Sequence, residues 1–128
     1  MAEDLSLRVG IVGLGLIGGS LAKAFREYTD CTVCGFDRDP AVVQAALDCG
    51  AIDRAGGEED FPRLDLLFLA VYPQAAVDFA RAHGAQIGRS CLVTDPCGVK
   101  TAVGAQMTEL SRALGFRFAG SHPMAGRE

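Results

Sequence analysis

Three glycines in one short stretch are the first residues whose spacing suggests chemistry. Gly13, Gly15 and Gly18 form the pattern G-x-G-x-x-G, which follows an apolar run and opens a helical pattern. The first glycine permits a tight turn, the second lets a phosphate approach the backbone, and the third lets the helix pack close to the strand. Leu16 and Ile17 belong to the same turn, where free N–H groups and the positive end of the helix dipole would face phosphate. We expect these five residues to bind the pyrophosphate of a dinucleotide.

An acidic residue favours this interpretation over a glycine-rich turn that binds nothing. Asp37 comes nineteen positions after Gly18, at the end of the next expected strand. An acid at this spacing hydrogen-bonds a ribose 2′-hydroxyl, and its charge would repel the extra phosphate of NADP, so NAD is the expected cofactor. Arg38 follows directly and could accept that phosphate instead, although we favour a surface position, stacked on the adenine. The alternative for Asp37 is a solvated loop charge.

The loop after the most apolar run is expected to pass beneath the cofactor. Residues 65–71 are near-continuously hydrophobic, as in a strand buried on both faces. Val71, Tyr72 and Pro73 end this run, and we count them with the cofactor-binding residues. Tyr72 could pack on the nicotinamide ribose, or it could be an aromatic residue that fills a gap in the loop.

Two later loops carry residues that could bind or act on ligands. Asp95, counted with the cofactor-binding residues, and Lys100 follow the expected strand at residues 90–94, where ligands sit in such sheets. A turn-capping role for Asp95 and a solvated side chain for Lys100 are the alternatives. His122 follows the last expected strand, on a loop braced by a proline and a glycine. Imidazole titrates near neutral pH and can take a proton from a substrate hydroxyl, although a loop histidine is more often structural or exposed.

Strands and helices alternate along the chain, and the residues above follow the strands. The expected strands are residues 7–12, 32–36, 65–71, 90–94 and 117–120, and the expected helices are residues 17–28, 40–48, 74–83 and 101–114. This order predicts an α/β fold with a doubly wound parallel sheet, the Rossmann dinucleotide-binding fold, in one domain over residues 1–128. Residues 51–63 are polar, with at most one short strand, and the acidic cluster at 58–60 is expected to be a solvated loop.

Composition excludes several other classes of function. The net charge of −4 argues against a nucleic-acid partner, because phosphate binding requires a basic surface. No apolar run approaches the ~20 residues of a membrane helix, and the N-terminus lacks the basic and apolar pattern of a signal peptide, so a cytoplasmic location is expected. The five cysteines are then expected to be reduced. Cys31 and Cys34 form a C-x-x-C on or beside a strand, where residues three apart face opposite sides, so no metal or redox site is expected.

Three stretches resemble prephenate dehydrogenases. They are residues 12–21 (VGLGLIGGSL), residues 94–100 (TDPCGVK) and residues 120–126 (GSHPMAG), of which the last is the most specific. The resemblance spans nearly the whole chain. It implies NAD-dependent oxidative decarboxylation of prephenate to 4-hydroxyphenylpyruvate, a step of tyrosine biosynthesis.

The same resemblance implies roles for particular residues. His122 would hydrogen-bond the ring hydroxyl of prephenate and accept its proton. Lys100, Ser121 and Glu128 would belong to the substrate pocket. Gly98 also lies there, where many members carry a serine that holds the substrate hydroxyl, whereas other members have a Cys-Gly pair as this chain does.

Family members continue into a mostly helical C-terminal domain that dimerises and binds the substrate carboxylates. The resemblance therefore implies that this chain is the cofactor-binding part of a homodimeric enzyme and stops before that domain. Three alternatives stay open. They are an arogenate dehydrogenase, another small Rossmann reductase, and a catalytically silent NAD-binding fragment.

Overall fold

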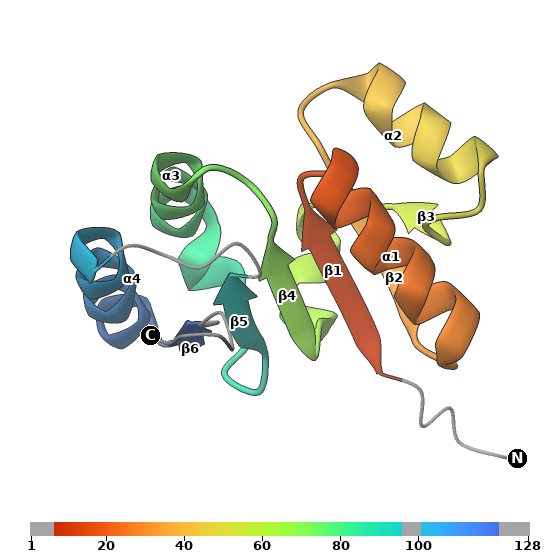
Figure 1. Ribbon diagram of the computed structural model, residues 1–128. Helices are drawn as coiled ribbons and strands as arrows, with labels where there is room; N and C mark the ends of the chain where they lie inside the picture. The colour runs from red at the N-terminus through yellow and green to blue at the C-terminus, as the bar shows by residue number, and fades with distance from the viewer. Residues whose placement is uncertain (1–6, 96–100, 121–128) are drawn as a thin grey trace, which may run out of the picture.

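The computed structural model describes residues 7–95 and 101–120 as a parallel six-stranded sheet flanked by helices (Figure 1). The strand order is β3-β2-β1-β4-β5-β6. The strands are β1 (Arg8–Val12), β2 (Thr32–Phe36), β3 (Arg54–Ala55), β4 (Leu66–Leu69), β5 (Leu92–Asp95) and β6 (Arg117–Gly120). The order reverses direction between β1 and β4, which is where doubly wound sheets bind their ligands.

Four α-helices and two short 3₁₀ helices connect the strands. They are α1 (Leu16–Tyr28), α2 (Pro40–Asp48), η1 (Glu58–Arg63), α3 (Pro73–His83), η2 (Gly84–Gln86) and α4 (Thr101–Leu114). Local chemistry sets several of these bounds. The Asp39 side chain caps α2 by accepting from the Ala41 N–H at 2.9 Å. Gly50 and Gly115, with φ of +78° and +91°, follow the ends of α2 and α4. Among the described residues, no helix is long and apolar enough to cross a membrane.

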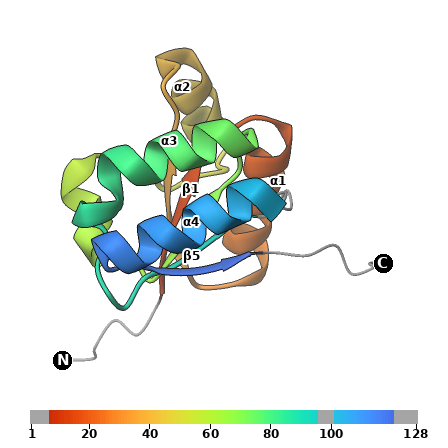
Figure 2. The same cartoon turned by 90° about the vertical axis from the view of Figure 1, so that its left-hand side faces the viewer.

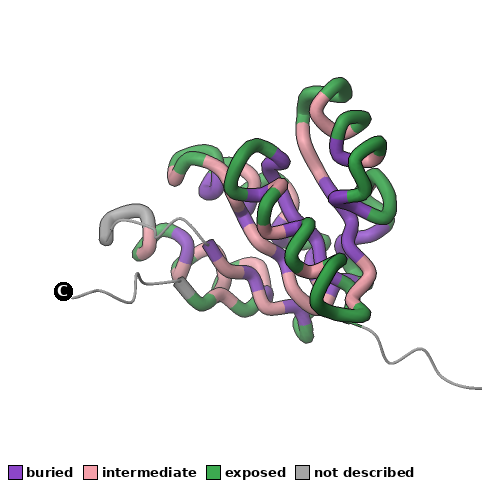
Figure 3. The backbone as a smooth tube through the Cα atoms, turned by 45° about the vertical axis from the view of Figure 1, so that its right-hand side comes forward, coloured by how far each residue is buried: buried purple, intermediate pink, exposed green. Residues whose placement is uncertain are grey.

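The sheet separates two hydrophobic cores, because side chains alternate along each strand. Val9 and Ile11 of β1 pack with α1 and α2, whereas Leu67 and Leu69 of β4 pack with α3 and α4. Figure 2 shows α3 and α4 lying side by side across one face. Figure 3 shows the buried residues gathered in the interior of the molecule and the exposed residues on the outer turns of the helices. The sheet is thus covered on both faces, as expected from the alternating sequence.

The acidic cluster at residues 58–60 is not the solvated loop expected from the sequence. It forms η1, and Asp60 is only 5% exposed. Its Oδ1 accepts from the Arg54 guanidinium at 2.7 Å and its Oδ2 from the Gly57 N–H at 2.8 Å. The expectation was wrong for Asp60 because β3 brings Arg54 beside it, and a buried carboxylate is stable when both oxygens are bound.

The expected bounds of the elements need small corrections. The strand expected at residues 65–71 ends at Leu69, and the strand expected at 90–94 is shifted to Leu92–Asp95. Helix α3 begins at Pro73, one residue earlier than expected. Proline suits this first helical position because its missing N–H would have no intrahelical partner there.

Candidate cofactor site

The glycine turn is wedged between the carboxyl ends of the two strands that flank β1. The Gly13 N–H donates to the Phe36 carbonyl at 2.8 Å, and the Ala70 N–H donates to the Val12 carbonyl at 2.8 Å. Gly13 has a φ of +90°, and a Cβ added there would lie 2.4 Å from the Ala70 carbonyl oxygen. Both the conformation and the space require glycine at this position.

The other two glycines of the motif serve different purposes. A Cβ added at Gly18 would lie 1.7 Å from the Gly13 carbonyl oxygen, so α1 can begin this close to β1 only with glycine there. At Gly15 the added Cβ would have no neighbour within 4 Å among the described residues. Packing within the chain therefore does not demand glycine at position 15, and its bare backbone leaves room for a ligand.

Asp37 is fixed beside the turn by two backbone amides. Its Oδ2 accepts from the Leu14 N–H and its Oδ1 from the Asp39 N–H, both at 2.9 Å. A carboxylate oxygen has more than one lone pair, so each can accept a further hydrogen bond from a ribose hydroxyl. Arg38, the next residue, is exposed.

Apolar side chains surround the turn without being covered by the described residues. Leu16 is 88% exposed, Ile17 53% and Tyr72 86%. Val71 is half-buried and packs against the core on the α3 side, and Pro73 begins α3. Exposed apolar groups gathered around a binding turn are typical of a surface that a ligand or a further part of a protein covers.

A groove of about 510 Å³ lies between α1 and α2. Leu14, Gly15 and Leu16 of the turn are part of its lining, which is mostly apolar. Asp37 is not among its lining residues. We therefore place the candidate site at the turn and Asp37, where the acid and the free amides meet, rather than in this larger groove.

The structure brings most of the expected cofactor-binding residues to the carboxyl ends of the strands. Asp95 is the last residue of β5, is 1% exposed and pairs in register with Gly120. The expected substrate-binding and catalytic residues lie outside the described residues: Gly98, Lys100, Ser121, His122 and Glu128. Their positions in the site remain the predictions of the sequence.

Sequence reasoning missed two residues that shape the turn. Leu14 supplies the amide that holds Asp37, and Ala70 supplies the backbone that Gly13 contacts. A Cβ at Gly18 would also lie 3.2 Å from the Ala70 Cβ, so a small residue is needed after β4 for α1 to approach. A small residue directly after a buried strand was the available signal for Ala70, whereas nothing in the sequence marked Leu14.

The comparisons with known proteins agree with this geometry. Residues 21–128 match the family model described as prephenate dehydrogenase, nucleotide-binding domain. The prephenate dehydrogenase of Lactococcus lactis subsp. cremoris is 28% identical in an alignment 126 residues long. The match covers 93% of this chain and 34% of that protein. The chain thus spans about a third of the length of this relative.

Solved structures of prephenate and arogenate dehydrogenases are also similar to this chain. The prephenate dehydrogenase from Aquifex aeolicus in complex with hydroxyphenyl propionate and NAD⁺ has a TM-score of 0.79 and 30% identity, over 98% of this chain and 45% of that one. Synechocystis arogenate dehydrogenase has a TM-score of 0.80 and 28% identity, over 91% of this chain and 41% of that one. A 3-hydroxyisobutyrate dehydrogenase from Mycobacterium tuberculosis, 15% identical with a TM-score of 0.79, shares the fold alone. The chain belongs to the family of prephenate dehydrogenase nucleotide-binding domains.

Proposed function

We propose that the chain is the NAD-binding domain of a dehydrogenase that oxidises prephenate. The observation that carries the proposal is the fixed position of Asp37 beside the glycine turn, with both of its oxygens held by backbone amides. An acid in this place binds the hydroxyls of the adenine ribose, while the amides at the start of α1 receive the pyrophosphate. The open backbone at Gly15 is the cradle that such a pyrophosphate needs.

The same aspartate supports NAD over NADP. Because two amides hold the Asp37 carboxylate, it cannot easily turn away from a 2′-phosphate, and the two negative charges would repel each other. Arg38 is exposed and free to stack on the adenine. The Aquifex relative was solved with NAD⁺, which agrees with this preference.

The reaction that we propose is the oxidative decarboxylation of prephenate to 4-hydroxyphenylpyruvate, a step of tyrosine biosynthesis. When bound, the nicotinamide ring supplies the hydride acceptor. His122 takes the proton of the ring hydroxyl as general base, and Lys100, Ser121 and Glu128 orient the substrate, with Gly98 in place of a serine. These roles rest on the family resemblance. Since the relatives are more than twice as long, we assign carboxylate binding and homodimer formation to a further domain like theirs.

Arogenate is the second candidate substrate, because the Synechocystis arogenate dehydrogenase resembles this chain as closely as the prephenate enzymes do. The two substrates differ only in a side-chain amine. Turnover of both by a longer form of the protein separates them. If no NADH forms from NAD⁺ with either substrate, both assignments are overturned. His122→Ala should abolish whichever activity is present.

The cofactor assignment is tested on the chain itself. We expect saturable binding of NADH in a fluorescence titration, with weaker binding of NADPH. Asp37→Asn should weaken NADH binding and reduce the discrimination between the two, because the charge that repels the 2′-phosphate is removed. Asp48→Asn is the matched control, since it removes an exposed carboxylate at the far end of α2 from Asp37. Binding of neither nucleotide, or tighter binding of NADPH, would contradict the proposal.

A further inference from the structure

A small hollow at the opposite end of the sheet is lined by three arginines. Arg8 begins β1, Arg54 begins β3, and Arg63 ends η1. They meet around a space of about 80 Å³ with Thr32 and Cys34 of β2. A cavity that holds a single water needs roughly 10–15 Å³. The hollow therefore has room for a small polyatomic ion but not for a dinucleotide.

The charges around this hollow are not balanced. Asp60 is the acidic residue in its lining, and Arg54 already pairs with it at 2.7 Å. Within residues 7–95 and 101–120, no carboxylate lies within ion-pairing distance of the guanidinium groups of Arg8 and Arg63. The lining residues alone carry a net charge of +2, from three arginines and one aspartate, and Asp53 and Glu59 also lie close enough to act on the Cys34 thiol.

Two neighbouring acids, Asp53 and Asp65, are held by other groups. Asp53 pairs with Arg26 at 2.6 Å, and its other oxygen accepts from the Val33 N–H. The Asp65 carboxylate accepts from the backbone N–H of Arg8, so it lies by the strand rather than at the guanidinium. The Thr32 hydroxyl makes no hydrogen bond within the described part of the chain, which leaves a further donor at the hollow.

We propose that this hollow binds the phosphate group of a small molecule. Guanidinium groups present paired N–H donors that match the oxygens of a phosphate, and the hydrogen bonds are charge-assisted. A phosphate carries a charge of about −1.5 to −2 near neutral pH, which the guanidinium groups of Arg8 and Arg63 would offset, since neither has an ion-pair partner among the described residues. The hollow lies at the amino ends of β1 and β2, about 16 Å from the glycine turn along the five residue steps from Arg8 to Gly13, given ~3.3 Å per strand residue. It is therefore a second site, independent of the proposed cofactor.

The test is a titration of the ¹⁵N-labelled chain with inorganic phosphate, followed by NMR residue by residue. We expect saturable shifts at the amides of Arg8, Thr32 and Arg63. Arg63→Gln and Arg8→Gln should each weaken phosphate binding at these amides about tenfold, the size of one lost charge-assisted hydrogen bond. Shifts at Gly15 and Leu16, where phosphate can also bind, should be unchanged in both variants.

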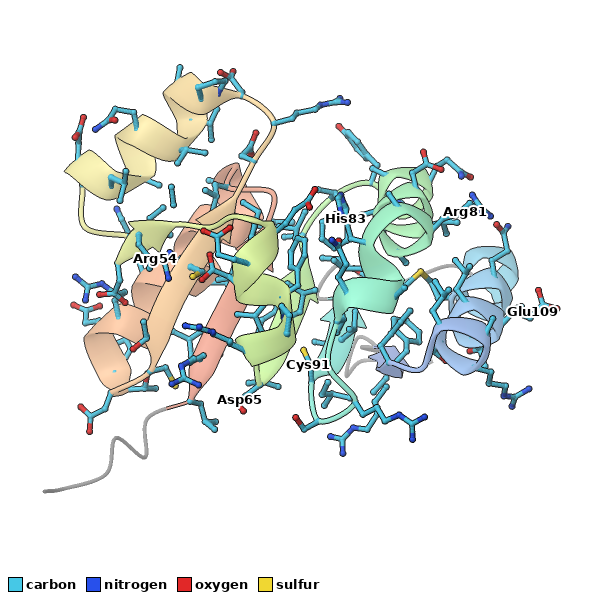
Figure 4. All side chains as sticks on the ribbon, turned by 180° about the vertical axis from the view of Figure 1, so that it is seen from behind. Arg54, Asp65, Arg81, His83, Cys91 and Glu109 are labelled. Atoms are coloured by element: carbon cyan, nitrogen blue, oxygen red, sulfur yellow. The ribbon has the colours of Figure 1, made fainter. Side chains whose placement is uncertain are left out.

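Two controls make the outcome decisive. Arg112→Gln removes an exposed guanidinium from α4, which Figure 4 shows on the far side of the molecule from Arg54. This variant should bind phosphate as the parent chain does. Acetate, titrated in parallel, should bind several-fold more weakly than phosphate. Shifts confined to the glycine turn, equal losses in Arg112→Gln, or acetate binding as tight as phosphate would each overturn the proposal.

Discussion

At the scale of single residues, the three glycines of the turn are constrained to different degrees. Gly13 is fixed by its positive φ and by the Ala70 carbonyl, and Gly18 by the Gly13 carbonyl. Gly15 has nothing beside it within the described chain. A motif that looks uniform in the sequence therefore mixes glycines that packing requires with one, Gly15, that packing does not require.

This difference predicts opposite behaviour for two alanine variants. Gly18→Ala should lower the free energy of unfolding by about 3 kcal/mol, because its Cβ must displace backbone atoms. Gly15→Ala should leave stability nearly unchanged but weaken NADH binding at least tenfold, because the methyl group enters the space of the pyrophosphate. Denaturant unfolding and NADH fluorescence measure the two effects.

Gly19→Ala serves as the matched control for both variants. Its Cβ would lie 3.5 Å from the Leu14 carbonyl oxygen, an ordinary contact, and Gly19 sits within α1. We expect this variant to bind NADH and to gain about 0.5–1 kcal/mol of stability, since alanine favours a helix over glycine. A stable Gly18→Ala chain, or full NADH binding by Gly15→Ala, would contradict the assignment of their roles.

A buried thiol predicts the alkaline stability of the domain. Burial, with a smaller contribution from Asp65, raises the pKa of Cys91 from 9.0 to about 12. Between these values the unfolded chain loses this proton while the folded chain keeps it. The stability contribution is therefore complete below pH 9 and falls by up to about 1.4 kcal/mol per pH unit above it. Burial also raises the pKa of Cys34, which acts in the same direction.

Cys91→Ala should flatten this alkaline decline, although the variant starts from a lower stability because it leaves a cavity. Cys49→Ala removes an exposed thiol and should leave the decline as it is. Urea unfolding at pH 8, 9 and 10 measures the slopes. Equal slopes for Cys91→Ala and the parent chain would show that the thiol ionises alike in both states.

At the scale of elements, the segment between β3 and β4 depends on one buried carboxylate, that of Asp60, which pairs with the exposed Arg54. Strand β3 has only two residues, and η1 takes the place of a longer crossover helix. Asp60 joins them by binding Arg54 of β3 and the Gly57 amide before η1. Phe61 of η1 then stacks on Phe36 of β2, with ring centroids 5.0 Å apart. The Asp60 carboxylate thus holds η1 against this face of the sheet.

We expect Asp60→Asn to lower the free energy of unfolding by about 1–3 kcal/mol, because one of its two buried hydrogen bonds is lost and Arg54 loses its partner. Glu59→Gln, an exposed neighbour in η1, should change stability by less than about 0.5 kcal/mol. Chemical denaturation of both variants tests this difference. Similar losses in the two variants would mean that the hydrogen bonds of the buried Asp60 carboxylate contribute nothing specific to stability.

At the scale of the whole molecule, the sheet has two outer strands, each of which has no neighbouring strand on one side among the described residues. Strands β3 and β6 are the outermost strands, and β6 is the longer of the two. A bare strand edge and the exposed apolar residues Leu16, Ile17 and Tyr72 both favour association. The chain by itself is therefore expected to self-associate.

Sedimentation velocity at rising concentration should show this association. Ala119→Lys places a charge on exposed β6 and should reduce it, as charges protect edge strands in natural sheets. Ala113→Lys adds the same charge to the exposed side of α4 and should have a smaller effect. A clean monomer of the parent chain at high concentration would contradict the expectation.

The sequence by itself determined the features that depend on neighbouring residues. The glycine turn, the Asp39 cap and the glycines after α2 and α4 act on adjacent residues, and the strands and helices expected from the sequence agree with the structure to within a few residues. The order of strands and helices also predicted the parallel sheet, at whose carboxyl end the described residues expected to bind the cofactor lie.

Only the tertiary structure decided which distant groups meet. The Leu14 amide on Asp37 spans 23 positions of the sequence, and the burial of Asp60 depends on β3 lying beside η1. The arginine hollow joins residues from β1, β2, β3 and η1. No periodicity or spacing encodes such contacts, because burial and charge balance depend on how separate elements pack against one another.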